Sequence, residues 1–222
     1  MDLFQAMRER HSVRSYTDKP LEGSVKEKLS AFITQCNEES SLHIQLVTDE
    51  PNAFDSRLAH YGKFSGVRNY IVMAGRKTAA LDELCGYYGE KIVLYAQTLG
   101  LNTCWVALTY SKSKAAFQLE QGEKVCLVIA IGYGQTQGVS HKVKPREAVM
   151  KVQGTPPEWF IRGIDAALLA PTAMNQQKFT FSLDGSTVTA KAGIGFYSKI
   201  DLGIVKYHFE LGAGAENFEW VS

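Results

Sequence analysis

The sequence carries almost no net charge and contains no long hydrophobic run. Its 24 Lys and Arg residues are balanced by 23 Asp and Glu residues, so the formal net charge is +1, and no overall attraction to nucleic acid or to an anionic membrane is expected. No segment approaches the roughly 18 consecutive apolar residues of a membrane span, and the N-terminus lacks the apolar core of a secretory signal. We therefore expect a cytoplasmic protein without a nucleic-acid or membrane partner.

Cysteine and histidine are few, and their spacing suits neither disulfides nor metal. The four cysteines are widely separated and include no Cys-x-x-Cys pair, which is typical of a protein in a reducing compartment. The five histidines show no metal-ligand spacing. We expect no metal site.

The 222-residue length suits one large domain or two small ones, and 45% hydrophobic residues are enough for a substantial core. Apolar residues at helical spacing predict helices near 2–10, 24–36, 84–99, 155–170 and 201–211. Strands are expected at 43–48, 70–74 and 125–131. Asp184-Gly185 predicts a hairpin with a type I′ turn between strands 179–183 and 187–190. This mixture favours an α+β fold over regular βαβ winding.

Arg10-His11-Ser12-Val13-Arg14, the first motif, places two guanidinium groups and a hydroxyl within five residues. A guanidinium can bind a phosphate through two parallel hydrogen bonds, although basic clusters near an N-terminus are also common on solvated surfaces. Ala170–Gln177, the second motif, combines Pro171 with three side chains that donate or accept hydrogen bonds. By itself this second motif is also typical of a helix end followed by a turn.

Together the two motifs resemble the FMN-dependent nitroreductase superfamily, in which Arg-x-Ser-x-Arg lies near the N-terminus and Ala-Pro-Ser/Thr-x-x-Asn-x-Gln ends a helix. Three further segments resemble the same family: Leu99–Trp105, Ile129–Gly134 and Lys142–Arg146. The resemblance covers most of the chain and implies a nitroreductase-like fold with a mixed or antiparallel sheet. The order of the motifs is rearranged, because the second motif appears only after residue 165 and not a few tens of residues after the first.

The resemblance implies FMN as the cofactor and suggests which residues bind it. The FMN phosphate would be held by the first motif, through Arg10, His11, Ser12 and Arg14, with help from Lys142 or Lys144. The ribityl chain and ring would be lined by the second motif, through Pro171, Thr172, Asn175 and Gln177. The alternative for the two lysines is an ordinary solvated loop.

A ping-pong reaction is also implied, in which NADH or NADPH reduces FMN and leaves before an electron-poor acceptor enters. The acceptor would be a small molecule such as a nitroaromatic or a quinone. Such a cycle needs neither a Ser/His/Asp triad nor a pair of catalytic carboxylates, and the sequence shows neither. Two alternatives stay open: a non-enzymatic flavin-binding protein for storage, sensing or regulation, and flavin chemistry other than nitro reduction, such as dehalogenation.

Gly132-Tyr133-Gly134 follows a predicted strand, but it lacks the third glycine and the immediate helix of a dinucleotide-binding turn. We expect these glycines to let the backbone here approach a neighbouring element or the flavin closely.

A faint internal repeat suggests a particular organisation of the single nitroreductase-like domain predicted over residues 1–222. The helix at 85–99 followed by Trp105-Val106 parallels the helix at 201–211 followed by Trp220-Val221. Members of the resembling family are homodimers with FMN at the subunit interface. One hypothesis is that two interleaved half-copies, about 1–150 and 151–222, make this chain a monomer that imitates that dimer. Chance similarity and an ordinary homodimer are the alternatives.

Overall fold

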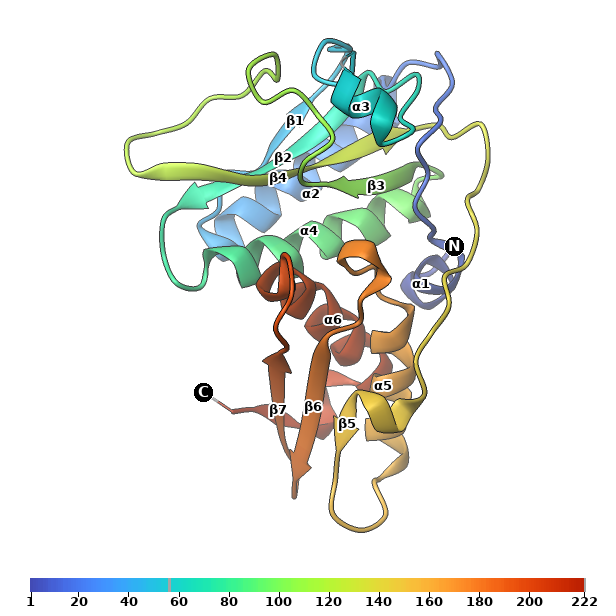
Figure 1. The fold of residues 1–222 in the computed structure, drawn as a ribbon, viewed down its shortest axis with the longest axis vertical. Coiled ribbons are helices and arrows are strands. Elements are labelled where there is room, and N and C mark those ends of the chain that lie inside the picture. The colour runs from blue at the N-terminus through green and yellow to red at the C-terminus, as the bar shows by residue number, and fades with distance from the viewer. Residues whose placement is uncertain (56, 222) are drawn as a thin grey trace. The chain divides into compact units, whose positions relative to one another are not determined.

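The computed structural model describes residues 1–55 and 57–221, and the chain divides into two compact units (Figure 1). Unit 1 comprises Met1–Leu81 and Ile92–Ser140, and unit 2 comprises Asp82–Lys91 and His141–Ser222. Helix α4, Leu81–Thr98, contributes residues to both. Each unit contains a four-stranded sheet and helices, so the predicted α+β class is confirmed.

The sheet of unit 1 is antiparallel throughout and has the strand order β1-β2-β4-β3. Its strands are β1 Gln45–Val47, β2 Asn69–Arg76, β3 Asn102–Val106 and β4 Glu123–Gly132. Every residue of β2 except the last is buried. This burial explains why the sequence of β2 is a continuous apolar run and not an alternating one, because neither face of a covered central strand meets water.

Different elements cover the two faces of this sheet. One face packs on a cluster that includes Val13, Tyr16, Phe54 and Phe64, so the segment after the first motif belongs to the core. Helix α2, Gly23–Ser40, and residues 92–98 of α4 lie on the side of the sheet away from α3, Arg57–Tyr61 (Figure 1). Phe32 of α2 stacks on Tyr95 of α4 with ring centroids 4.1 Å apart. The short α1, Leu3–Glu9, leads into the first motif.

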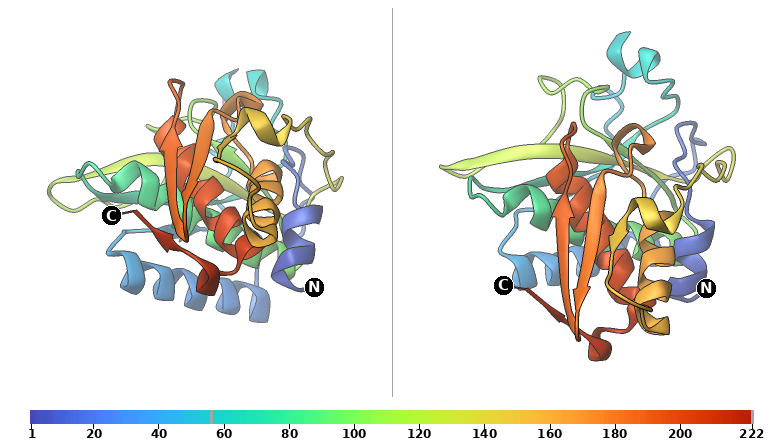
Figure 2. Two further views of the ribbon diagram at one scale, coloured as in Figure 1. Left: turned by 90° about the horizontal axis from the view of Figure 1, so that it is seen from below. Right: turned by 60° about the horizontal axis from the view of Figure 1, so that its bottom comes forward.

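The sheet of unit 2 has the order β5-β6-β7-β8 (Figure 2). Its strands are β5 Met150–Lys151, β6 Phe179–Asp184, β7 Thr187–Ala192 and β8 Glu219–Trp220. The central pair forms the predicted hairpin, and the two outer pairs are parallel. The predicted type I′ turn is wrong. Asp184 pairs with Thr187, and only Gly185 of the two-residue loop has a positive φ, which is the requirement of a type II′ turn.

Aromatic side chains form the core of unit 2 between this sheet and its two long helices, α5 Glu158–Leu169 and α6 Ser198–Ala213. Phe209 stacks on Phe181 at 4.5 Å and meets the edge of Phe160 at 5.5 Å. A Cβ atom at Gly163 would lie 2.6 Å from the Phe209 ring, so glycine lets α5 pack closely there. Three short 3-10 turns complete the unit: Arg146–Ala148, Ala173–Asn175 and Ala215–Asn217.

The last helix was expected to begin at Asp201 and to end before Gly212, and both bounds are wrong. Helix α6 begins at Ser198 and is followed by Gly214, whose φ is 80°. Gly212 lies inside the helix, where a Cβ atom would come 2.5 Å from the carbonyl oxygen of Arg162 on α5. Helix packing and not capping therefore requires the glycine at 212. In the part of the chain that the structure describes, no helix is long and apolar enough to cross a bilayer.

Candidate functional site

The first motif runs as an extended strand segment along the edge of the unit 1 sheet. Arg10 ends α1 with extended backbone. Ser12 forms a β-bridge with Thr103 of β3, and the N–H of Val13 donates to the Thr103 carbonyl at 3.0 Å. Backbone bonds of this kind fix which side chains share a face, because side chains alternate along an extended chain. Arg10, Ser12 and Arg14 are therefore placed by β3.

These three side chains all act on the thiol of Cys104, which is 1% exposed. Burial raises the pKa of Cys104, whereas the Arg14 guanidinium, a hydrogen bond with Ser12 and the Arg10 guanidinium all lower it. Arg10 itself is only 3% exposed, and Arg14 is exposed. Two positive charges and a hydroxyl thus converge beside β3, which is the donor set that an anion requires.

The Gly-Tyr-Gly end of β4 lies against the first motif. The N–H of Gly134 donates to Oδ1 of Asn102 at 2.9 Å, and a Cβ atom at Gly134 would lie 2.8 Å from the Val13 side chain. The expected close approach of this backbone to a neighbouring element is confirmed at Gly134. His11 is half-buried, and its Cβ atom faces Gly138 in the same loop region.

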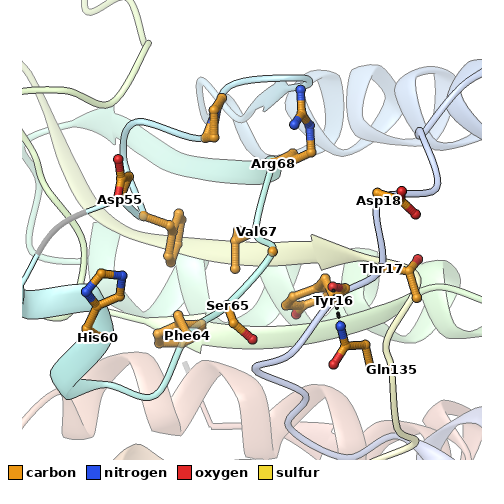
Figure 3. A pocket seen from close by; sticks show the side chains of 13 residues that line it. Tyr16, Thr17, Asp18, Asp55, His60, Phe64, Ser65, Val67, Arg68 and Gln135 are labelled. Atoms are coloured by element: carbon orange, nitrogen blue, oxygen red, sulfur yellow. Dashed lines mark hydrogen bonds between the residues drawn. The ribbon is translucent and has the colours of Figure 1, made fainter.

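A cavity of about 690 Å³ opens in unit 1 next to the first motif (Figure 3). Aromatic rings and polar groups line it together: Tyr16, Thr17, Asp18, Pro51, Phe54, Asp55, His60, Phe64, Ser65, Gly66, Val67, Arg68 and Gln135. The Arg14 guanidinium lies 5.9 Å from the centroid of the Phe64 ring. The size and mixed lining of this cavity are those of a small-molecule site.

Hydrogen bonds link residues that line this cavity to Ser15, the residue that follows the first motif. The Ser15 hydroxyl lies 2.8 Å from the Ser65 hydroxyl and donates to Oε1 of Gln135 at 2.7 Å. Gln135 in turn donates to the Tyr16 carbonyl (Figure 3). Sequence reasoning missed this cavity because its residues come from separate segments that share no motif, and only the sheet brings them together.

The second motif, in unit 2, forms a tight turn with an unusual backbone. Met174, Asn175 and Gln177 have φ values of 51°, 52° and 44°. Only glycine adopts such left-handed conformations easily, and each costs a residue with a side chain on the order of 1–3 kcal/mol unless its surroundings enforce it. Asn tolerates the conformation better than Met or Gln. The turn must therefore be held by bonds to its neighbours.

Many of these bonds come from Lys142–Lys144. The buried Gln177 side chain accepts from the Lys144 N–H at 2.9 Å and donates to the Lys142 carbonyl at 2.8 Å. Asn175 donates to the same carbonyl at 2.8 Å, and the Thr172 hydroxyl accepts from the Gln177 N–H at 3.0 Å. These bonds bring together Lys142, Lys144, Thr172, Asn175 and Gln177. Pro171 directly precedes Thr172.

The two lysines differ in what their ammonium groups do. Nζ of Lys144 donates to the carbonyls of Gln176 and Gln177 at 2.8 and 3.0 Å. Lys142 is exposed, and its backbone carbonyl accepts from Asn175 and Gln177. Lys144 is consequently a structural support of the turn, whereas the Lys142 ammonium is the one directed to solvent.

Asp201 is a further residue at this turn, and the sequence marked it only as the start of the last predicted helix. It is 3% exposed and accepts hydrogen bonds from the Ala173 N–H at 2.9 Å and from Nε2 of Gln176 at 2.7 Å. Burial raises the pKa of Asp201 to about 6, against the opposite effect of those two hydrogen bonds. A carboxylate within the apolar sequence of α6 was the signal that could have revealed this role.

A family model described as "Putative TM nitroreductase" matches residues 2–213. Among solved structures, a putative nitroreductase from Thermotoga maritima is 23% identical and has a TM-score of 0.68, over 97% of this chain and 85% of that one. A putative nitroreductase from Desulfovibrio desulfuricans, in complex with FMN, is 17% identical with a TM-score of 0.53, over 70% and 99% of the two chains. No curated protein matches. The structural similarities show the nitroreductase-like fold that the motifs predicted.

Proposed function

This chain belongs to the family described as "Putative TM nitroreductase", and we propose that it binds FMN non-covalently and passes electrons from NADH or NADPH to an electron-poor small molecule. Family membership makes it an oxidoreductase. The observation that supports FMN is the convergence of Arg10, Ser12 and Arg14 beside β3. The Desulfovibrio structure with the same fold contains FMN.

The donor groups of the first motif fit the phosphate end of FMN. A phosphate monoester carries about 1.5–2 negative charges at neutral pH and three acceptor oxygens. Two guanidinium groups and a hydroxyl supply both the charge and the donors that such a group requires. Arg10 is buried at the end of α1, whereas Arg14 is exposed. We assign Arg10 and Ser12 to the inner part of the phosphate site and Arg14 to its open side, with His11 between them in the chain.

The second motif offers neutral groups, which suit the ribityl hydroxyls and the ring edge of a flavin. Pro171, Thr172, Asn175 and Gln177 are proposed to form this surface, contributed by the same chain or by a second copy. Their side chains are oriented by bonds to one another and to Lys142–Lys144. A site with prearranged groups does not lose binding energy to ordering them when the ligand arrives. Lys142 would add a positive charge for the phosphate.

Bound FMN would supply the two-electron chemistry, and the chain's residues would bind it, orient it and tune it. A positive side chain or backbone N–H near the ring stabilises negative charge that develops there. No catalytic acid or base is assigned to the chain. Nitroaromatics and quinones are the proposed acceptors.

Spectroscopy and a coupled assay test this function directly. Protein loaded with FMN and freed of excess ligand should keep flavin absorbance, release FMN and not FAD, and oxidise NADH or NADPH when a quinone or nitroaromatic is added. Failure to retain flavin at micromolar concentrations would exclude the proposal. Retention of flavin without NADH or NADPH oxidation would instead favour a storage, sensing or regulatory protein.

We also propose that the chain holds about one FMN and is stable as a monomer, as expected if it contains two half-copies of the family's subunit. Light scattering combined with the ratio of flavin to protein measures both quantities. A stable homodimer with two FMN molecules would favour the ordinary homodimer.

A further inference from the structure

The turn at 172–177 has a backbone conformation that its own residues disfavour. Met174, Asn175 and Gln177 all adopt left-handed backbone, which L-residues avoid. Lys142–Lys144 holds the Gln177 side of the turn, as described above. The turn has two further groups, the Ala173 N–H and the side-chain amide of Gln176, which Lys142–Lys144 does not bind.

Asp201 binds both groups from the first turn of α6. One carboxylate oxygen accepts from the Ala173 N–H at 2.9 Å, and the other accepts from Nε2 of Gln176 at 2.7 Å. Gln176 also donates to the Phe196 carbonyl at 2.7 Å, so its amide joins the turn to the segment before α6. A Cβ atom at Gly195 would lie 2.3 Å from Oε1 of Gln176, and glycine at 195 therefore makes room for this amide.

The charges around Asp201 leave its carboxylate dependent on these hydrogen bonds. In the sequence of α6 the lysines on either side of Asp201 are Lys199 and Lys206, and Lys206 pairs with Glu83 of α4 at 2.8 Å. Tyr197 precedes the helix. Among the described residues Asp201 forms no ion pair, and its pKa is governed by burial and by the bonds from Gln176 and Ala173. The N-terminal end of α6 favours a negative charge there.

We propose that Asp201 is the positioning residue that keeps the 172–177 turn in its flavin-binding shape. This inference rests on the proposed function, because it takes the turn to be a flavin contact. An ionised carboxylate has two acceptor oxygens, one for the Ala173 N–H and one for Nε2 of Gln176. Once protonated, it keeps one good acceptor and turns the other oxygen into a donor, which then faces the donor N–H group of Gln176.

Stability and positioning respond to pH in opposite directions, which separates the two roles. The folded pKa of Asp201, about 6, lies above its ordinary value of 3.8. Between these values the folded state binds more protons than the unfolded state, so lowering the pH through this window stabilises the fold. Flavin binding should weaken in the same window, because the turn loses an acceptor. Loss of flavin near pH 5 would therefore not be explained by unfolding at Asp201.

Riboflavin is the appropriate probe, because the FMN phosphate itself titrates near pH 6. Riboflavin affinity is measured by quenching of flavin fluorescence between pH 5 and 8, with thermal melting of each variant in the same buffers. The test variant is Asp201→Asn, which still accepts from Ala173 but presents an amide N–H to Gln176. The control is Asp165→Asn, an exposed aspartate of unit 2 that pairs with Arg146.

Wild-type protein should bind riboflavin less tightly as the pH falls below about 6. Asp201→Asn should bind roughly tenfold more weakly at pH 8, as expected for loss of a charge-assisted hydrogen bond, and should show less dependence on pH. Asp165→Asn should follow the wild type. Should Asp201→Asn melt too early to be measured, Gln176→Ala removes the same hydrogen bond from the turn side and should give the same loss.

The results separate failure of the inference about Asp201 from failure of the proposed function. Equal riboflavin affinity of Asp201→Asn and wild type at pH 8 would overturn the inference, and so would a weakened variant that keeps the full wild-type pH profile. Wild-type protein that binds neither FMN nor riboflavin would overturn the proposed function itself, and that result is distinguishable because it does not depend on any variant.

Discussion

His208 and Glu90 form a completely buried hydrogen bond, with Nε2 of the imidazole 2.9 Å from Oε1 of the carboxyl group. Nδ1 of His208 lies 3.0 Å from the Ala166 carbonyl. A carbonyl oxygen can only accept, so Nδ1 must carry a proton. A second proton then lies between Nε2 and Oε1, whichever atom holds it. The pair is neutral overall, and it links α6 to α4 and α5 within unit 2.

Removing one member of this pair should destabilise unit 2 strongly. Glu90→Leu leaves Nε2 of His208 buried without its partner, and a loss of about 1–3 kcal/mol in the free energy of unfolding is expected. Glu90→Gln should cost less, because an amide can donate to Nε2 while Nδ1 keeps its proton. Urea unfolding measures both. Glu158→Ala, an exposed partner of Arg162, is the control and should change little. Similar losses for the Leu and Gln variants would contradict this reading.

Gly203 should tolerate no larger residue, because α6 lies directly on α4 there. A Cβ atom at Gly203 would come 1.9 Å from the Glu83 carbonyl, and one at Gly86 would come 2.0 Å from the Ile200 carbonyl. Gly203→Ala should therefore lower the free energy of unfolding by about 3 kcal/mol or more, since backbone must move. Gly193→Ala, whose Cβ atom would lie 3.2 Å from Lys178, should cost clearly less in the same denaturation assay. Equal costs would mean that the helix contact is looser than described.

Arg14→Ala should weaken FMN binding by about tenfold or more, the loss expected for one charge-assisted hydrogen bond. Riboflavin has no phosphate, so its affinity should hardly change. Fluorescence titration with both ligands provides the comparison. Arg162→Ala removes an exposed arginine of unit 2 that pairs with Glu158, and it should affect neither ligand. Equal losses for FMN and riboflavin after Arg14→Ala would place the phosphate site elsewhere.

Substitutions of Lys142 and Lys144 should have different effects on the affinities for FMN and riboflavin. Lys144→Met removes the ammonium that binds the Gln176 and Gln177 carbonyls, so the turn loosens and FMN and riboflavin should lose affinity alike. Lys142→Met should weaken FMN alone, because only the phosphate needs that charge. Isothermal titration of both ligands with both variants tests this pattern. The reverse pattern would assign the phosphate contact to Lys144.

Local sequence determined the elements whose signals are continuous. The apolar run at 70–74 predicted β2, and Val125–Ile131 predicted most of β4, because a strand covered on both faces must be apolar at successive positions. The periodic apolar residues of α4 gave its extent to within a few residues. The two motifs were likewise readable from residue types alone. How they act on a ligand stays a prediction.

Tertiary structure decided what depends on contacts between distant segments. Asp201 faces the turn at Ala173 and not its own helix end, Gly212 serves the packing of α5 on α6, and Lys144 supports a backbone that its own sequence does not reveal. The cavity near Phe64 assembles only when the sheet of unit 1 forms. Sequence patterns report which face of an element is apolar, but a buried carboxylate, a close glycine or a cavity is defined by which partner that face meets.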